Sequence, residues 1–566
     1  MISKPTGCLA ITAVVFASLL TLGGCATKRS GAHLALTGIV SSNAEGPMEG
    51  VLVSAKRVGS TITVTVVTDK QGHYSFPANR LGPGQYLITA RAVGYQPTQP
   101  ELAATVGQNN IEYDIKLQKT SDLADQLTSA EWVMSAPGTP AQKASLFACT
   151  QCHTATQVFR STYDAAGWLP TLVRMRNYDP GSTLSYPVPL PYHNGPRPGD
   201  KEFANYLSSI NLSGGRTTWS FPLKSLPRPT GEETRVIITE YDLPRADAAP
   251  HDAIMDSNGI IWYDDDRQAI LGRLDPRTGQ TKEWSLPVVK PGFNPGSLNL
   301  AIDHAGNVWI ARLFQAAVAR FDPKTGKITT WREPAKYDNV HSRTSHLAVT
   351  PDGKVWFADT FNRRMNLLDP ATGRITSYPA FPNWKWSWAT DMGSGDRGKK
   401  PEGHFIFGVG SDSRDWGVFA DKAGSNIGMI DPAGKTILYP TPTVNSGPRE
   451  LRVDSEDRVW FGEDNVAKIG MFDIKTKAFK EWNTDPARVE DDYGAVIDKD
   501  GYVWTGGVES SFVTRLDPKT GEITQYLLPR LDVNIRCVNV DNFTNPPSLL
   551  IGENHRAKIA IVQPLQ

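Results

Sequence analysis

The 566-residue sequence predicts a mainly β protein that consists of an N-terminal β-sandwich, a small α-helical domain and a C-terminal seven-bladed β-propeller. The composition is the first indication, because 49 glycines, 41 prolines and 15 tryptophans indicate many turns and few long helices. The second is a repeat of about 45 residues from residue 234 onward, a period typical of propeller blades. The third is that helical patterns are confined to short segments between residues 119 and 212.

Residues 1–25 have the features of an export signal, with an early Lys4, an apolar run and small residues before Cys25. The apolar run is too short to span a bilayer well. Its ending, Leu-Gly-Gly-Cys, resembles a bacterial lipoprotein signal, which implies that Cys25 becomes the lipidated first residue of the mature protein. Because Ala26 follows, we expect a periplasmic protein with a lipid anchor in the outer membrane. The alternative is a secreted protein that is cleaved near the same place.

Residues 33–118 alternate short β-strands with turns. Residues 50–55 and 62–67 have strand-like sequences, and residues 69–72 form a turn. Turn signals about every ten residues predict a small sandwich of about six or seven strands. With "TDKQGHYSF" and "GPGQYLITA", the segment resembles the carboxypeptidase regulatory-like (transthyretin-like) domain. The resemblance implies a fold but no chemistry, so we expect a spacer or a weak adhesion module.

The pattern Cys149-Thr150-Gln151-Cys152-His153 is the most informative feature of the chain. It is the attachment pattern of c-type haem, in which Cys149 and Cys152 form thioethers to the porphyrin and His153 ligates the iron. A structural zinc site would need a second pair of ligands, and no other cysteine lies within 120 residues on either side. A thioredoxin-like pair would need a strand-to-helix context. We therefore expect one covalent haem c.

The helical patterns around the motif predict a cytochrome c-like domain over residues 138–212. Residues 142–148 predict a helix that leads into the motif, and apolar spacing predicts a second helix over 201–210. This second helix resembles the closing helix of class I cytochromes c. Met175 is the first candidate for the sixth iron ligand, because a thioether raises the potential and suits electron transfer. His193 and an open sixth position are the alternatives.

From residue 234 to residue 566 the chain repeats itself. The repeated tryptophans, each preceded by a turn and a β-branched residue, are Trp262, Trp309, Trp356, Trp460 and Trp504. A second tag, Asp-Pro-x-Thr-Gly, follows most of them and is typical of a hairpin turn. The long interval after Trp356 accommodates one divergent unit, and a degenerate unit follows Trp504. Residues 237–241 are expected to complete the last of seven blades.

These repeats, with "PHDAIMDSNGIIW" and "RLDPRTGQTKEWSLP", resemble virginiamycin B lyase (streptogramin lyase) and its relatives. The resemblance covers about 330 residues and implies a magnesium-dependent elimination that opens an ester ring. In the family, histidines in Pro-His-x-Ile loops and acidic residues just after the tryptophan perform this chemistry. Such a reaction needs a base for a carbon acid and a cation for the developing enolate.

The repeat allows each family position to be compared across the seven units. The positions of the family histidine are occupied by His251, Leu298, Ser345, Trp386, Arg449, Tyr493 and Arg536. The positions three residues after the tryptophan are occupied by Asp265, Arg312, Asp359, Val409, Glu463, Gly507 and Glu553. If the loops before the inner strands line one end of the channel, these side chains form a polar, partly aromatic pocket.

Only His251 retains a family histidine, so it is the candidate catalytic base. The alternative is a hydrogen-bonded structural histidine. His346 lies one residue out of register, and in an extended segment its side chain should point elsewhere.

The remaining candidates suit binding rather than proton transfer. Arg449 and Arg536 would bind a carboxylate or another anionic group, and Trp386 and Tyr493 would supply aromatic walls. Glu553 is the candidate ligand for a divalent ion such as Mg²⁺.

Charge and cysteine usage limit the possible partners. Lysine plus arginine and aspartate plus glutamate both number 59, so the net charge is zero and no nucleic-acid partner is expected. The cysteines form no disulfide framework, and Cys537 is expected to be a small buried residue.

Three functions fit these observations. The first is an exported oxidoreductase whose propeller binds a small polar or anionic substrate, or a redox partner, while the haem passes electrons to a periplasmic carrier. The second is a virginiamycin B lyase-like metal-dependent C–O lyase with an accessory cytochrome. The third is a non-enzymatic electron-transfer or docking protein.

Overall fold

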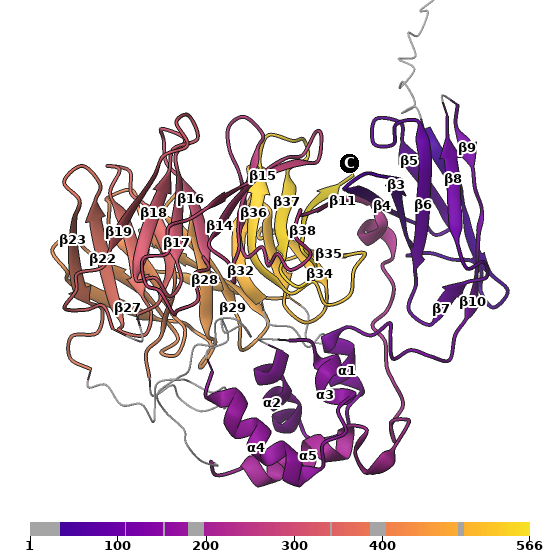
Figure 1. Ribbon diagram of the computed structural model, residues 1–566, viewed down its shortest axis with the longest axis horizontal. Coiled ribbons are helices and arrows are strands. Elements are labelled where there is room, and N and C mark those ends of the chain that lie inside the picture. The colour runs from indigo at the N-terminus through magenta and orange to yellow at the C-terminus, as the bar shows by residue number, and fades with distance from the viewer. Residues whose placement is uncertain are drawn as a thin grey trace, which may run out of the picture.

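The computed structural model describes residues 34–107, 109–150, 153–178, 197–339, 342–384, 403–484 and 492–565. The predicted export signal with Cys25, together with Cys152, His193 and Trp386, lies outside these residues. As predicted, the protein is mainly β, with a compact group of helices beside the sheets (Figure 1). None of the described helices is both long and apolar enough to cross a membrane.

The N-terminal part is a β-sandwich of ten strands. They are β1 (Leu34–Ser42), β2 (Gly46–Pro47), β3 (Leu52–Arg57), β4 (Ile62–Val67), β5 (His73–Pro77), β6 (Gly84–Arg91), β7 (Tyr95–Pro97), β8 (Leu102–Val106), β9 (Ile111–Glu112) and β10 (Ile115–Lys119). Alternation places Tyr74 and Phe76 of β5 and Tyr86 and Ile88 of β6 in one buried cluster. The predicted sandwich is therefore present.

Strand β11 (Val236–Asp242) joins this sandwich to the C-terminal part. On one side it pairs antiparallel with β38 (Lys558–Pro564), which confirms the prediction that residues 237–241 complete the last unit. On its other side it pairs antiparallel with β4, and Thr239 lies opposite Val64. One continuous sheet results, in the order β36-β37-β38-β11-β4-β3-β6-β8. The sequence did not predict this shared sheet.

The C-terminal part has six further sheets of four antiparallel strands. Their strands, sheet by sheet, are β12 (Ala253–Met255), β13 (Ile261–Asp264), β14 (Ile270–Asp275) and β15 (Gln280–Ser285); β16 (Asn299–Ile302), β17 (Val308–Arg312), β18 (Ala317–Phe321) and β19 (Ile328–Arg332); β20 (Thr344–Val349), β21 (Val355–Asp359), β22 (Arg364–Asp369) and β23 (Arg374–Pro379). The next three sheets contain β24 (Ile406–Ser411), β25 (Gly417–Asp421), β26 (Asn426–Ile430) and β27 (Thr436–Pro440); β28 (Pro448–Val453), β29 (Arg458–Glu463), β30 (Lys468–Asp473) and β31 (Phe479–Asn483); β32 (Asp492–Ile497), β33 (Val503–Gly507), β34 (Phe512–Leu516) and β35 (Ile523–Leu527). The last sheet begins with β36 (Ile535–Asp541) and β37 (Ser548–Glu553).

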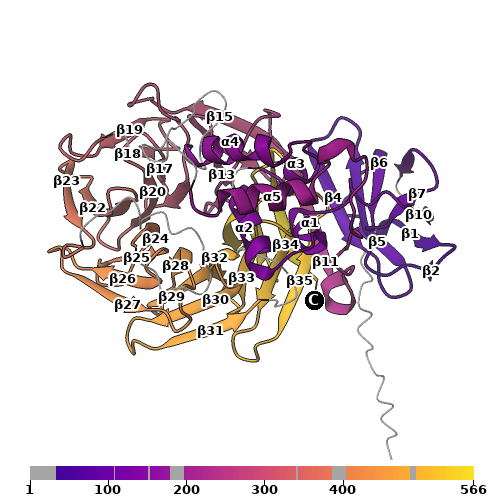
Figure 2. The ribbon, with the colours of Figure 1, turned by 90° about the horizontal axis from the view of Figure 1, so that it is seen from below.

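The sheets are arranged in a ring, as in a β-propeller (Figure 2). The first strand of each sheet contacts the first strand of the next, from β12 through β16, β20, β24, β28 and β32 to β36. Strand β36 in turn contacts β12, so these inner strands surround a common axis. Side chains from sheets that are not neighbours in the ring can therefore meet only near that axis.

A repeated hydrogen bond explains why aspartate and tryptophan recur together. In four units the tryptophan indole donates to an aspartate six residues earlier, over 2.8–3.0 Å. The other carboxylate oxygen of the same aspartate accepts from backbone N–H groups, as Asp498 does from Asp500 and Tyr502. The aspartate thus closes the turn and satisfies a buried indole at once.

Five short α-helices lie on one face of the ring (Figures 1 and 2). They are α1 (Ser129–Ser135), α2 (Pro140–Thr150), α3 (Ala155–Phe159), α4 (Ala165–Arg176) and α5 (Asp200–Ile210), with 3₁₀ turns η1 (Ser213–Gly215) and η2 (Gly231–Thr234) in the following segment. The helices expected over residues 142–148 and 201–210 are confirmed as α2 and α5. Helix α1 begins at Ser129 because Thr128 and Glu131 form a capping box.

Buried hydrogen bonds fasten the helices to the ring. The backbone N–H and the hydroxyl of Ser129 each donate to Asp532 Oδ1 over 3.0 Å. The hydroxyl of Thr150 donates to Glu509 Oε1 over 2.9 Å, and the Ala130 N–H donates to the Glu509 carbonyl over 3.2 Å. Asp532 and Glu509 belong to loops of the last two sheets, so the helices are fixed against that side of the ring.

Replacing Asp498 with alanine should destabilise the protein. The Asp498→Ala change leaves the Trp504 indole, which is 0% exposed, without its acceptor and removes two turn hydrogen bonds. We expect a loss of about 2–4 kcal/mol in the free energy of unfolding, measured by urea denaturation. The exposed Asp500→Ala change in the same turn is the control and should cost less than about 0.5 kcal/mol. Equal losses for the two variants would contradict this account of the repeat.

Candidate functional site

Five inner strands carry a β-bulge near their first residues, and this controls which side chains face the axis. In β36, for example, the register shifts between Ile535 and Val538, so one extra residue lies between two ladder pairs. The same shift occurs near the start of β20, β24, β28 and β32. A bulge interrupts strict alternation, so consecutive side chains such as Arg536 and Cys537 both face His251.

His251 is fully enclosed at the axis. Its Nε2 lies 3.0 Å from the hydroxyl of Tyr493, and its Nδ1 lies 3.3 Å from Cys537 Sγ. Burial and the nearby charge of Arg536 hold the pKa of His251 well below its usual value, so the imidazole is neutral. A neutral imidazole with both nitrogens engaged and 0% exposure fits the structural alternative better than a base that a substrate must reach.

The two predicted anion-binding arginines lie beside His251, and each already has a carboxylate partner. Arg449 covers the ring of Tyr493 at 3.7 Å and forms an ion pair with Asp464 Oδ1 over 2.5 Å. Arg536 lies 3.5 Å from Asp266 Oδ2. An incoming carboxylate would have to compete with these aspartates. Tyr493, whose pKa is raised by burial, is a neutral phenol in this group.

The acidic residues that follow the tryptophans serve mainly local roles. Asp265 forms an ion pair with Arg245 over 2.6 Å and accepts backbone N–H groups. Glu463 is buried, and burial together with Glu481 raises its pKa to about 8. Glu553 is 0% exposed, and burial together with Glu240 holds its pKa well above the usual value.

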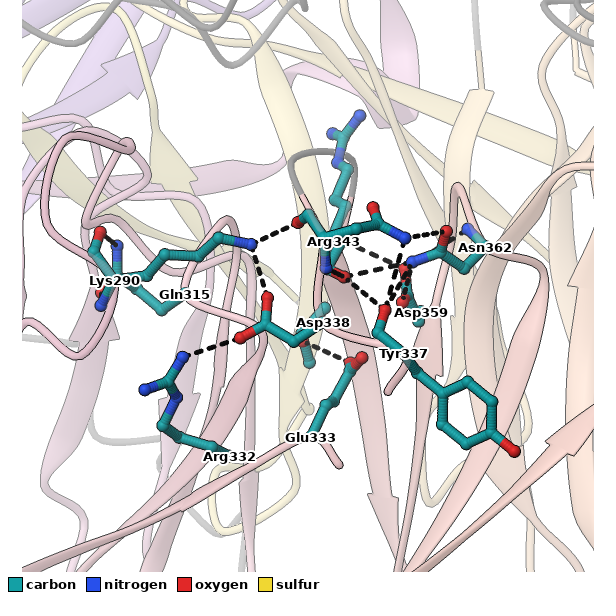
Figure 3. Close-up of polar contacts among 12 residues, drawn as sticks. Lys290, Gln315, Arg332, Glu333, Tyr337, Asp338, Arg343, Asp359 and Asn362 are labelled. Atoms are coloured by element: carbon teal, nitrogen blue, oxygen red, sulfur yellow. Dashed lines mark hydrogen bonds and ion pairs between the residues drawn. The ribbon is translucent and has the colours of Figure 1, made fainter. Parts of the chain in front are cut away.

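A polar network supports the loops of the second and third sheets (Figure 3). Asp338 forms ion pairs with Lys290 and with Arg332, each over 2.7 Å. The backbone N–H of Arg343 donates to Asp359 Oδ1 over 3.1 Å, while its guanidinium points away from the network. The positive charge of Arg343 contributes to the lowered pKa of His251.

A second group of side chains lies around His251, and its other four members each follow the family histidine position by one residue. We call His251, Asp252, His346, Glu450 and Cys537 the axial cluster; they come from the first, third, fifth and seventh sheets of the ring. Ligand atoms of His251, Asp252 and Cys537 all lie within 4.8 Å of one another, and so do those of His346, Glu450 and Cys537. All five residues are buried.

The expectation that His346 points elsewhere was wrong, because the bulge in β20 turns its side chain toward the axis. Glu450 and Cys537 follow the family position by one residue in the same way. A comparison of the repeats one residue later would have found them, since that position is occupied by Asp252, Asn299, His346, Glu450, Gly494 and Cys537.

The haem-attachment motif begins in the last turn of α2. Cys149 packs against a buried cluster that includes Leu146, Phe147, Trp168 and Leu207. The structure does not describe Cys152, whereas His153 is half-buried directly after it. Met175 lies near the end of α4 with a 47% exposed side chain.

The comparisons with known proteins agree with two parts of this architecture. Residues 35–118 match the family model of the carboxypeptidase regulatory-like domain. This confirms the resemblance predicted for residues 33–118. The comparison with curated proteins gave no match.

Solved structures with a similar fold include virginiamycin B lyases. The selenomethionine-substituted enzyme from Staphylococcus aureus is 18% identical with a TM-score of 0.49, and the match covers 58% of this chain and 99% of that one. A streptogramin B lyase is 19% identical with a TM-score of 0.49, and the match covers 59% and 100% of the two chains. A hydrazine synthase from Kuenenia stuttgartiensis is 15% identical with a TM-score of 0.37, and the match covers 48% and 77%. Residue roles in the present chain are argued from its own geometry.

The buried carboxyl of Glu463 should make stability depend on pH. Its pKa of about 8 exceeds the ordinary value of 4.5, so the folded protein retains a proton that the unfolded chain releases. The free energy of unfolding therefore decreases as pH rises from 4.5 to about 8. In Glu463→Gln this decrease should be shallower by about 1.4 kcal/mol per pH unit, measured by urea unfolding across that range. The exposed Glu456→Gln change is the control; identical slopes in wild type and Glu463→Gln would disprove the assignment.

Proposed function

We propose that the protein is an exported haem c electron-transfer protein, anchored through lipidated Cys25 at the periplasmic side of the outer membrane. In this proposal the helices α1–α5 form the cytochrome c-like domain, and the seven sheets of the ring form a seven-bladed propeller. The propeller binds a small polar or anionic substrate or a redox partner. The haem then passes electrons to a periplasmic carrier.

The observation that carries the proposal is the Cys-x-x-Cys-His motif at the end of a helix against an apolar cluster. Cys149 and Cys152 would hold a haem through thioethers and His153 would ligate its iron; Cys149 lies in the last turn of α2, which ends at Thr150. The surroundings fit a porphyrin, since Leu146, Phe147, Trp168 and Leu207 supply apolar walls. The buried Trp168 Nε1 has no hydrogen-bond acceptor among the described residues, so a bound group could supply one.

The position of the motif supports a link between the haem domain and the ring. Thr150, inside the motif, donates to Glu509 of the sixth sheet's loop, and this bond is buried. His153 is near enough to contribute to the lowered pKa of His555, which burial and Arg536 bring to about 3. The charge of Arg536 lowers the pKa of both His251 and His555. The motif therefore lies near the end of the axis that holds Arg449 and Arg536.

A bound haem would supply reversible one-electron transfer. The chain itself contributes orientation and electrostatics. Helix α2 holds Cys149, and the buried bonds of Ser129 and Thr150 fix the helices on the ring. Arg449 and Arg536 lie at the adjacent end of the axis, where an anionic partner would bind them in competition with Asp464 and Asp266.

Elimination chemistry is less well supported. His251 is 0% exposed and both of its nitrogens are engaged, so it offers no accessible base. The sixth iron ligand remains a prediction: Met175 is described and exposed, and His193 lies outside the described residues.

Haem content tests the proposal directly. The full-length protein, made in a host with haem c maturation, should contain one haem per chain that survives denaturation, measured by the pyridine haemochrome spectrum and intact mass. Dithionite should sharpen the visible bands as the iron is reduced. The double change Cys149→Ser and Cys152→Ser should abolish covalent haem, because no thioether can form.

The control is Ser145→Ala, an exposed position in the same helix, which should retain full haem content. A matured wild-type preparation with no Soret band and the mass of the bare polypeptide would overturn the proposal.

A further inference from the structure

The axial cluster has no role in the proposed haem chemistry. It combines one thiol, two imidazoles and two carboxyls, all from 0 to 2% exposed, on inner strands from four different sheets. Burying so many polar groups is costly unless each has a partner. The arrangement therefore needs an explanation of its own.

The separations between its ligand atoms match those around a small metal ion. His251 Nδ1 lies 3.3 Å from Cys537 Sγ and 3.9 Å from Asp252 Oδ1, and His346 Nε2 lies 4.0 Å from Glu450 Oε1. Tetrahedral ligands at zinc distances of about 2.0–2.3 Å are separated by roughly 3.3–3.7 Å. The two triads share Cys537, but their ligand atoms do not all lie within 4.8 Å of one another, so one ion bound by four of these residues would draw the two triads together around Cys537.

His346 provides the independent observation. Neither of its ring nitrogens has a hydrogen-bond partner of acceptable geometry among the described residues, although the backbone of Phe407 lies nearby. Burying this imidazole at 0% exposure is unfavourable, because its nitrogens lose the hydrogen bonds that they would make to water. A metal ion at Nε2 would remove the larger part of this cost.

We propose that the axial cluster binds one divalent transition ion, for which Zn²⁺ fits best. Its ligands are Cys537 Sγ, His251 Nδ1, His346 Nε2 and a carboxylate oxygen of Glu450, with Asp252 close behind. A thiolate and two imidazoles favour zinc over Mg²⁺, which prefers oxygen ligands in octahedral geometry. This site is distinct from the magnesium site predicted at Glu553, which stays a prediction. This inference does not depend on the haem.

The neighbouring residues fit this assignment. The hydroxyl of Tyr493 lies 3.0 Å from His251 Nε2, so in the tautomer protonated at Nε2 it would accept that N–H and leave Nδ1 to bind the metal. Arg452 forms an ion pair with Glu450 over 2.5 Å. Arg452 and a divalent ion together balance the three negative charges of Cys537, Glu450 and Asp252.

The ion would act as a structural crosslink. Cys537 belongs to a buried apolar cluster with Phe314, Phe361, Phe407 and Tyr493, which shields the site from water. Four protein ligands leave no open position, as in structural rather than catalytic zinc sites. Because the ligands come from the first, third, fifth and seventh sheets, one ion would tie the ring together across its axis.

The test uses the full-length haem-loaded protein, in which Cys149 and Cys152 are blocked as thioethers. If the protein carries no haem, the zinc test is done on the Cys149→Ser/Cys152→Ser variant instead. Failure of the haem proposal can then be distinguished from failure of the zinc proposal. After chelation and dialysis against Zn²⁺, elemental analysis should find one zinc per chain. Zinc X-ray absorption should show one sulfur neighbour at about 2.3 Å and nitrogen or oxygen at about 2.0–2.2 Å.

Two variants sharpen the result. Cys537→Ser should remove the sulfur neighbour from the zinc X-ray absorption spectrum. Both Cys537→Ser and His346→Gln should weaken zinc binding at least tenfold. Zinc should raise the thermal midpoint of the wild type, and neither variant should show this rise. His404→Gln is the matched control, since His404 pairs with Asp421 outside the cluster and should leave zinc binding unchanged. Wild-type protein that binds no zinc, or zinc without a sulfur neighbour, would overturn the inference even if the variants fail to fold.

Discussion

The antiparallel pairing of β11 on both of its sides is the constraint on which the rest of the structure depends. By pairing with β38, β11 completes the last sheet of the ring, although β11 comes before all the other strands of the ring in the sequence. Through β4 it continues the same sheet into the N-terminal sandwich. The chain leaves the sandwich after β10 and returns to it only with β11. Helices α1–α5 lie in the segment between these two strands. Their position on one face of the ring follows from this path.

The ring in turn determines where chemistry can occur. Each sheet contributes its innermost strand to a shared axis, and bulges near the start of these strands allow consecutive residues to face it. Arg449, Tyr493 and Arg536 gather at one level, next to the helices that carry the haem motif. Cys537 and His346 lie among the buried residues one position further along. The proposed haem site and the proposed metal site on the axis are thus separate features of one scaffold.

Much of the fold follows from local patterns in the sequence. The tryptophan and aspartate repeat and the helix before Cys149 both depend on contacts within one repeat or one helix. The pairing of β4 with β11 was not predictable, because it joins two segments about 170 residues apart by backbone hydrogen bonds that no side chain specifies. His346 and Cys537 were missed for a related reason: strict alternation was assumed, and a bulge reverses it.

The central claim is that the sandwich and the ring share one sheet through β11 and so open as one cooperative unit. Hydrogen exchange in increasing guanidinium, followed by mass spectrometry, measures the opening free energy of β4 and of β38 separately. The account predicts that peptides covering residues 62–67 and 558–564 exchange with the same opening free energy and the same dependence on denaturant. Exchange of β4 at clearly lower denaturant, while β38 stays protected, would contradict it.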